Sequence, residues 1–128
     1  MMFEPRIWLA VATGGALGAL MRYLVSSLLG QSSPPAFPWP TWIVNIAGSL
    51  LLGYLLGLVA SERFGSPTWR LFWTTGFCGA LTTFSAFSAE GVAMMRQGQF
   101  SSALIYVVTS VIICFAASAC GFWGGARL

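Results

Sequence analysis

The sequence has very few charged residues. Only 7% of its 128 residues are Asp, Glu, Lys or Arg, whereas 57% are hydrophobic and the mean hydropathy is +0.80. A soluble domain has about 25% charged and about 45–50% apolar residues. This composition excludes an ordinary soluble domain and predicts a membrane protein.

Histidine is absent, and cysteine is scarce. The three cysteines, Cys78, Cys114 and Cys120, lie in apolar stretches and show no Cys-x-x-Cys spacing. Zinc-type sites need Cys or His ligands at short, regular spacing. The sequence therefore indicates neither a metal site built from such side chains nor a disulfide framework.

Long polar segments are also missing. Four apolar stretches account for most of the chain, at about residues 7–29, 41–60, 70–95 and 101–126. Each is near or above the ~20 residues that cross a bilayer as a helix. Three connections join them, at residues 31–40, 61–69 and 96–100, and all are too short to fold alone. We predict an all-α membrane protein in which residues 1–128 form a single domain of four transmembrane helices.

The arginines show no strong bias to one side of the membrane. If four helices cross, four of the six arginines fall on the side of both termini and two on the other. Cytoplasmic loops usually carry an excess of Lys and Arg, so this weak bias allows insertion in both orientations and pairing of inverted copies. The net charge of +3 is spread singly over the span ends, which favours lipid headgroups over nucleic acid as the partner.

No carboxylate falls near the middle of a predicted span. Proton-coupled pumps and cation channels usually have one there, whereas the only acid inside a span is Glu90, toward one end of span 70–95. We interpret Glu90 as an interfacial anchor or as a salt-bridge partner of Arg22 or Arg96, rather than as an ion ligand.

Hydroxyl and amide side chains take the place of charge in two spans. Residues four apart lie along one ridge of a helix. Two such ridges occur, Thr41, Asn45 and Ser49 in the second span and Tyr106, Ser110, Cys114 and Ser118 in the fourth. O–H and N–H donors without a counter-ion suit a small anion, because they can replace its hydration shell. Asn45 at membrane depth faces either a partner helix or a water-filled path.

The third span contains the segment GFCGALTTFSAFSAE, residues 76–90. Its glycines lower helix propensity, and its hydroxyls can satisfy freed backbone groups. We predict that this span is interrupted near its centre, where exposed carbonyls would suit a cation. Phe84 and Phe87 lie three apart and project from nearly the same face, and a ring edge attracts an anion. Ordinary packing is the alternative for this pair.

Glycines four apart occur in three of the spans. The pairs are Gly14 and Gly18, Gly53 and Gly57, and Gly121 and Gly125. Such spacing lets two membrane helices approach closely. The pairs therefore predict close packing, either within one subunit or across a dimer.

Taken together, these segments closely resemble the Fluc (CrcB) family of fluoride channels. The resemblance is carried by GFCGALTTFSAFSAE, by GGALGALMRY in the first span and by WIVNIAGSLLLG in the second, and it covers all four spans in order. It implies a passive, fluoride-selective channel of the bacterial inner membrane, not an enzyme, that exports cytoplasmic fluoride. It also implies an antiparallel, dual-topology homodimer with two pores and a broken third helix, which agrees with the weak arginine bias.

The resemblance also assigns roles to individual residues. Those implied to line the fluoride pores are Phe84, Phe87, Asn45, Thr41, Tyr106, Ser110, Thr83, Ser85 and Ser88. A structural sodium ion (Na+) at the dimer centre is implied to bind the backbone carbonyls of Gly79 and Thr82 from both subunits. Arg22 and Glu90 match residues with a structural or orienting role. Cys114 stands where some relatives have a serine, and its part in the path is open because a thiol is the weaker donor.

Two other functions remain open from the residues alone. One is a small proton-coupled antiporter, in which Glu90 would be the coupling group. The other is a membrane scaffold without transport activity, which would assemble through the glycine pairs.

Overall fold

The structure, a computed structural model, describes residues 3–30 and 37–128. Residues 31–36, which form most of the predicted 31–40 connection, lie outside the described residues. The described chain is helical and contains no strand. Its segments are α1 (Pro5–Leu29), α2 (Trp39–Ala60), α3 (Pro67–Leu71), the π-helix η1 (Phe72–Cys78), α4 (Gly79–Leu81), α5 (Phe84–Arg96) and α6 (Phe100–Arg127).

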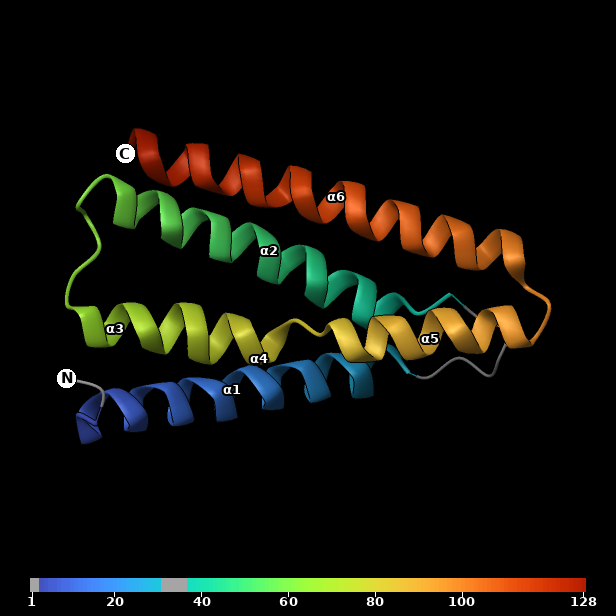
Figure 1. Ribbon diagram of the computed structural model, residues 1–128, viewed down its shortest axis with the longest axis horizontal. Helices are drawn as coiled ribbons and strands as arrows, with labels where there is room; N and C mark the ends of the chain where they lie inside the picture. Colours follow the sequence, from blue (N-terminus) through green and yellow to red (C-terminus); the bar gives the residue numbers. More distant parts are fainter. Residues whose placement is uncertain (1–2, 31–36) are drawn as a thin grey trace.

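The helices run up and down along one long axis (Figure 1). Both termini lie at the same end of the molecule as the connection between α2 and α3, and the turn from α5 to α6 lies at the other end. α2 packs along α6, while α1 packs along η1 and α4. The α5–α6 turn is tight because Gly98 adopts a positive φ of 75°, a conformation that glycine adopts without steric cost.

Among the described residues, three helices are long and apolar enough to cross a membrane: Pro5–Leu29, Trp39–Ala60 and Phe100–Arg127. They coincide with the predicted spans at 7–29, 41–60 and 101–126, so the all-α class and these three spans are confirmed. The chain exposes 8195 Å², whereas a soluble monomer of this mass would expose about 6600 Å². Its outer surface includes many large apolar side chains, among them Leu104, Ile112 and Phe115. This surface requires a lipid or protein partner rather than water.

The glycine pairs pack within the subunit. A methyl group added at Gly53 would meet the backbone carbonyl of Ser118, and one added at Gly57 would meet that of Phe122. From the other helix, Gly121 and Gly125 approach the carbonyls of Leu50 and Tyr54 in the same way. The backbones of α2 and α6 are therefore in direct contact, which is what small residues permit in membrane helices. Gly14 and Gly18 of α1 approach the carbonyls of Phe72 and Phe77 in η1.

The predicted third stretch, 70–95, falls on four successive helical segments rather than one. Ser66 caps α3, with its Oγ accepting a hydrogen bond from the Trp69 N–H, and Pro67 occupies the first helical position, which suits its fixed φ. Between α4 and α5 the backbone is extended at two residues, with φ −81° and ψ 155° at Thr82 and φ −150° and ψ 118° at Thr83. Figure 1 shows this connection near mid-length of the molecule.

Candidate functional site

Asn45 of α2 pairs with the extended backbone of Thr83. Its Nδ2 donates to the Thr83 carbonyl at 3.2 Å, and the Thr83 N–H donates to its Oδ1 at 2.8 Å. The amide thus satisfies both polar groups of one peptide residue, as a neighbouring strand would. One proton of Nδ2 is left, because a side-chain amide has two. Asn45 therefore contacts the extended connection before α5, and it also lines the cavity described below.

This pairing diverts helical donors from their usual acceptors. In a continuous helix the Thr83 N–H would donate to the Gly79 carbonyl, and the Ala86 N–H to the Thr82 carbonyl. Instead the Thr83 N–H binds Asn45, and the Ala86 N–H donates to Thr83 Oγ1 at 3.1 Å, capping α5. Within the described part of the chain, the carbonyls of Gly79 and Thr82 receive no hydrogen bond. Each keeps its lone pairs for another ligand.

Two other carbonyls of this segment, those of Cys78 in η1 and Ala80 in α4, do have partners. The N–H and Oγ1 of Thr82 both donate to the Cys78 carbonyl, at 3.1 Å and 3.0 Å. Arg22 of α1 donates through Nε to the Ala80 carbonyl at 3.2 Å. A cation at a helix C-terminus is favourable, so Arg22 stabilises the break in the way a C-terminal cap does.

Glu90 of α5 accepts two short hydrogen bonds from neighbouring helices. Thr41 Oγ1 of α2 donates to its Oε1 at 2.7 Å, and Tyr106 Oη of α6 donates to its Oε2 at 2.6 Å. Of the two interpretations of Glu90, the ion pair with Arg22 or Arg96 is not formed among the described residues; Arg22 donates to the Ala80 carbonyl instead. The reason is geometric: Glu90 faces α2 and α6, whereas Arg22 turns to the end of α4. The carboxylate joins three helices.

A cavity of about 300 Å³ lies between α2, α5 and α6, beside the Thr82–Thr83 connection. Its lining residues are Asn45, Gly48, Ser49, Leu52, Thr82, Thr83, Phe84, Phe87, Ser110, Val111, Cys114 and Phe115. Ser110 is only 5% exposed, and its buried Oγ has no hydrogen-bond partner among the described residues. An unsatisfied buried hydroxyl costs free energy. It indicates a ligand or water inside the cavity.

Phe84 and Phe87 are neighbours on one wall of this cavity. Their ring centroids are 5.5 Å apart with an interplanar angle of 46°. Phe87 also packs on Tyr106 at 5.2 Å, whereas Phe84 is 80% exposed at the outer edge. Phe37 continues the row of rings, with an edge-on contact to Tyr106 at 5.4 Å. The sequence pattern did not identify Phe37, because it lies outside the helices.

The other sequence-predicted residues lie in two groups. Thr83 lines the cavity, and its hydroxyl lies 3.2 Å from that of Ser85. Ser88 donates to the carbonyl of Phe84 in its own helix, so this proton is already used. Ser85, Ser88, Thr41 and Tyr106 are outside the lining set. Leu52, Val111 and Phe115 do line it and were not predicted, because an apolar side chain carries no signal that separates a cavity wall from a lipid-facing surface.

Cys114 is part of the cavity wall. Cys114 is half-buried, Cys78 is buried and Cys120 is exposed, and all three are free thiols. No group of three or more His, Cys, Asp and Glu side chains that could hold a metal ion occurs among the described residues.

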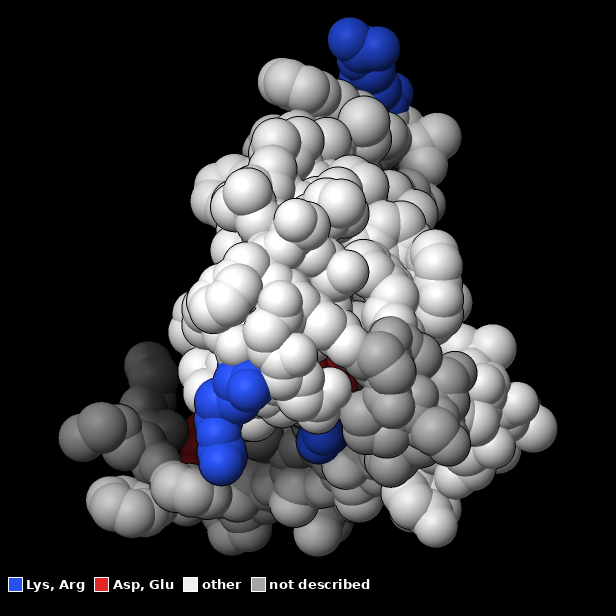
Figure 2. Space-filling view, turned by 90° about the vertical axis from the view of Figure 1, so that its right-hand side faces the viewer, with Lys and Arg blue, Asp and Glu red and all other residues white. Residues whose placement is uncertain are grey.

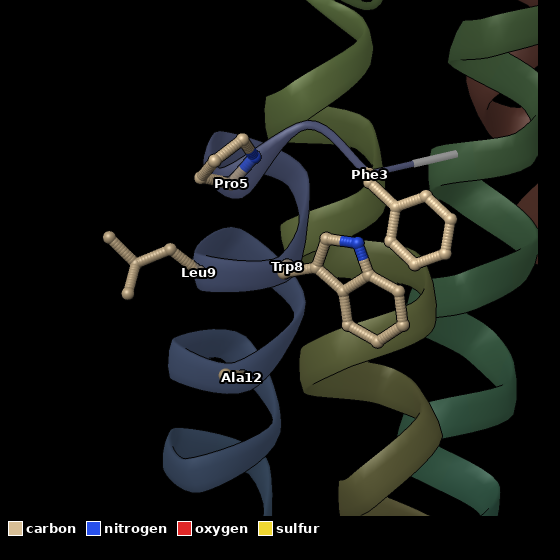
Figure 3. Close-up of a pocket in the computed structure, with 5 residues that line it drawn as sticks. All are labelled: Phe3, Pro5, Trp8, Leu9 and Ala12. Atoms are coloured by element: carbon tan, nitrogen blue, oxygen red, sulfur yellow. The ribbon is translucent and has the colours of Figure 1, made fainter. Parts of the chain in front are cut away.

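A second hollow, of about 630 Å³, lies on the outer side of α1 near the N-terminus. Figure 3 shows Phe3 and Trp8 side by side, with Leu9 pointing away from them. The two rings are nearly parallel, with centroids 6.3 Å apart. All the residues that line this hollow, Phe3, Pro5, Trp8, Leu9 and Ala12, are apolar or aromatic. It suits a membrane interface and has no convergent polar groups for an ion.

Charge is sparse at the end of the molecule where α5 turns into α6. Figure 2 shows this end as mostly uncharged surface with separate basic patches and very little acidic surface. An anion approaching from this end therefore meets more positive than negative charge.

Comparison with known proteins places the chain beside one family. Residues 9–122 match the family described as CrcB-like protein, Camphor Resistance (CrcB). A Rhizobium meliloti protein named fluoride-specific ion channel FluC is 47% identical over 103 residues, covering 80% of this chain and 82% of the relative. Relatives of the same name from Hahella chejuensis and Thermococcus kodakarensis are 46% and 44% identical. They cover 85% and 91% of this chain, and 87% and 94% of their own lengths.

Proposed function

This chain belongs to the CrcB family, and from that premise we propose that it is a fluoride-specific ion channel. It is a multi-pass membrane protein and not an enzyme. The observation that carries the proposal is the unpartnered hydroxyl of Ser110 in a cavity that also contains Phe84 and Phe87. The cavity offers donors and ring edges without a basic side chain, and this combination fits a small anion.

Fluoride exchanges its water for protein donors inside the cavity. The Ser110 O–H and the second Nδ2 proton of Asn45 are available, because neither has another acceptor among the described residues. Phe84 and Phe87 supply edges with positive partial charge. Thr41 and Tyr106 donate to Glu90 in this arrangement. Because their hydroxyl protons are used in this way, Thr41 and Tyr106 contribute by fixing the position of the Glu90 side chain beside the pathway rather than by binding fluoride directly.

The channel is passive. Fluoride leaves the cytoplasm down its gradient. None of the residues that line the cavity is acidic or basic, and the nearby Glu90 side chain already accepts hydrogen bonds from Thr41 and Tyr106. We place the protein in the bacterial inner membrane, with the stretch from α3 to α5 as a fourth, interrupted span. Extended backbone at this depth is tolerated where it is covered by protein or lines a cavity, and Asn45 provides such cover for Thr83.

Two inverted copies form the functional unit, with two pores. Support comes from the apolar outer surface and from Phe84, which lines the cavity and yet is 80% exposed in one subunit. A second copy would close the open edge of each cavity. Membrane lipid covers the remaining apolar surface.

A sodium ion at the dimer centre fits the carbonyls that are free. Gly79 and Thr82 are the residues whose helical donors are diverted to Asn45 and Thr83, and unwound carbonyls of this kind coordinate sodium in membrane proteins. An inverted second subunit would offer the same pair. The carbonyls of Gly79 and Thr82 would hold the ion, whose positive charge would offset the repulsion between the facing carbonyl dipoles of two subunits.

Fluoride efflux from liposomes tests the proposal. Purified protein with a potassium–valinomycin shunt should release trapped fluoride rapidly and retain chloride. Ser110→Ala should slow release by about fivefold, the effect of one lost hydrogen bond, whereas Ser101→Ala, on the exposed start of the same helix, should leave it unchanged. Equal leakage of chloride and fluoride would contradict a selective channel, and absence of any flux would favour a scaffold.

A further inference from the structure

We propose that Cys114 is a modification site within the conducting cavity, where a small thiol-reactive molecule forms an adduct that slows fluoride flux. The inference rests on the proposed channel function. The proposed channel function assigns the Cys114 side chain no part in conduction.

The position of the thiol follows from the ridge on α6. Cys114 lies one helical turn after Ser110, and both residues line the same cavity. Ser110 is over nine-tenths buried, and its hydroxyl has no protein partner, which indicates that a ligand or water enters this part of the cavity. A species that reaches the Ser110 hydroxyl is therefore one turn from the Cys114 sulfur.

The two other cysteines differ in ways that make them internal controls. Cys78 is 1% exposed, lies at the end of η1 and is not among the residues that line the cavity. Cys120 is exposed on α6 and is also absent from the lining. An adduct on Cys120 adds volume to the outer surface only, whereas an adduct on Cys114 adds volume to the cavity.

The reaction needs a co-reactant with an activated sulfur, such as a thiosulfonate. With methyl methanethiosulfonate, the Cys114 thiolate attacks the sulfenyl sulfur. A new S–S bond forms between Cys114 and the methylthio group, the S–SO2 bond breaks, and methanesulfinate leaves with the electron pair. The thiol proton passes to solvent. A dithiol reductant reverses the step and restores the thiol.

The expected effect follows from the size of the cavity. About 300 Å³ holds about ten water molecules, since each takes about 30 Å³ in the liquid. A methylthio group occupies part of this volume, is apolar, and replaces a weak donor beside Ser110. A benzylthio group from the corresponding benzyl reagent fills more of the cavity. The block should therefore grow with the size of the adduct.

The test is fluoride efflux from liposomes before and after treatment, with peptide mass mapping of each cysteine. In wild-type protein and in Cys120→Ser, the methyl reagent should slow efflux by about tenfold, the benzyl reagent by more, and dithiothreitol should restore the rate. Cys114→Ser should conduct before treatment and be insensitive afterwards. If Cys114→Ser fails to fold, the same evidence comes from Cys120→Ser, in which the block should be reversed by dithiothreitol while mapping finds the adduct on Cys114 and not on Cys78.

Three results would overturn the inference: wild-type efflux unchanged although mapping shows the Cys114 adduct, no adduct on Cys114, or equal inhibition in Cys114→Ser. Failure of the proposed function looks different, because the untreated protein then releases no fluoride. In that case labelling of Cys114 ahead of Cys78 would still support an accessible cavity thiol, and an unlabelled Cys114 would contradict it.

Discussion

The side chain of Asn45 pairs with the backbone of Thr83 through two hydrogen bonds, of 3.2 Å and 2.8 Å. This pairing holds the chain extended between α4 and α5 and diverts the Thr83 N–H from the Gly79 carbonyl. The Thr83 hydroxyl then caps α5, which begins at Phe84, and diverts the Ala86 N–H from the Thr82 carbonyl. One amide on α2 thus determines both the cation-facing and the anion-facing parts of the proposed site.

Asn45→Asp should stop fluoride efflux and destabilise the protein. A carboxylate can accept from the Thr83 N–H but cannot donate to its carbonyl, and its charge repels the anion. We expect a loss of about 1–3 kcal/mol in the free energy of unfolding, measured by thermal unfolding in detergent. Gln97→Glu adds the same charge on the exposed α5–α6 turn and should conduct normally. Wild-type efflux in Asn45→Asp would remove this residue from the pathway.

Phe84→Ile and Phe87→Ile should each slow fluoride release by about tenfold, because an aliphatic side chain keeps the volume and lacks the positive ring edge. Dimer size on gel filtration should be retained. Phe100→Ile, at the exposed start of α6, is the matched control. If both cavity variants conduct like the wild type, the two rings serve packing alone.

Glu90→Gln separates the channel from a proton-coupled antiporter. An amide offers one acceptor oxygen, so one of the hydroxyls of Thr41 and Tyr106 loses its acceptor, and stability should fall by about 1–3 kcal/mol. Fluoride efflux should continue without a proton gradient in the wild type and, more slowly, in the variant. Glu62→Gln, on an exposed residue, should change neither quantity. An antiporter would require the gradient and lose all transport in Glu90→Gln.

Gly57→Ala should separate α2 from α6. Its added methyl group would meet the Phe122 carbonyl and lie 2.8 Å from the Ala126 nitrogen, so we expect a loss of about 2 kcal/mol or more. Gly124→Ala adds the same methyl group to α6 with no heavy atom within 4 Å and should be neutral or slightly stabilising. Equal melting temperatures of the two variants would show that the α2–α6 contact tolerates expansion.

Gly79→Ala tests the sodium site and the dimer together. Within one subunit the added methyl group meets only the Thr74 carbonyl, at 3.8 Å, and φ is −63°, so the subunit itself should tolerate it. We expect the dimer fraction of Gly79→Ala on gel filtration to be lower than that of the wild type. We also expect the wild-type dimer fraction to fall when the sodium in the buffer is replaced by a bulky organic cation. Thr82→Val is the companion variant. Unchanged dimers in sodium-free buffer would contradict the site.

The sequence by itself determined the membrane class and the three long spans, because apolar length and scarcity of charge are properties of composition and need no partner. The segment from Gly76 to Glu90 also indicated an interruption, since glycines and hydroxyls weaken a helix locally. The family could be recognised for the same reason: its motif is contiguous in the chain.

Only the tertiary structure decided which groups meet. Glu90 could pair with any nearby cation by sequence distance, and it is the packing of α2, α5 and α6 that gives it Thr41 and Tyr106 instead. Likewise Asn45 and Thr83 are 38 residues apart, and the orphaned hydroxyl of Ser110 exists only because no neighbour from another helix reaches it. Contacts between distant residues depend on helix rotation and separation, which side-chain periodicity along a single helix does not specify.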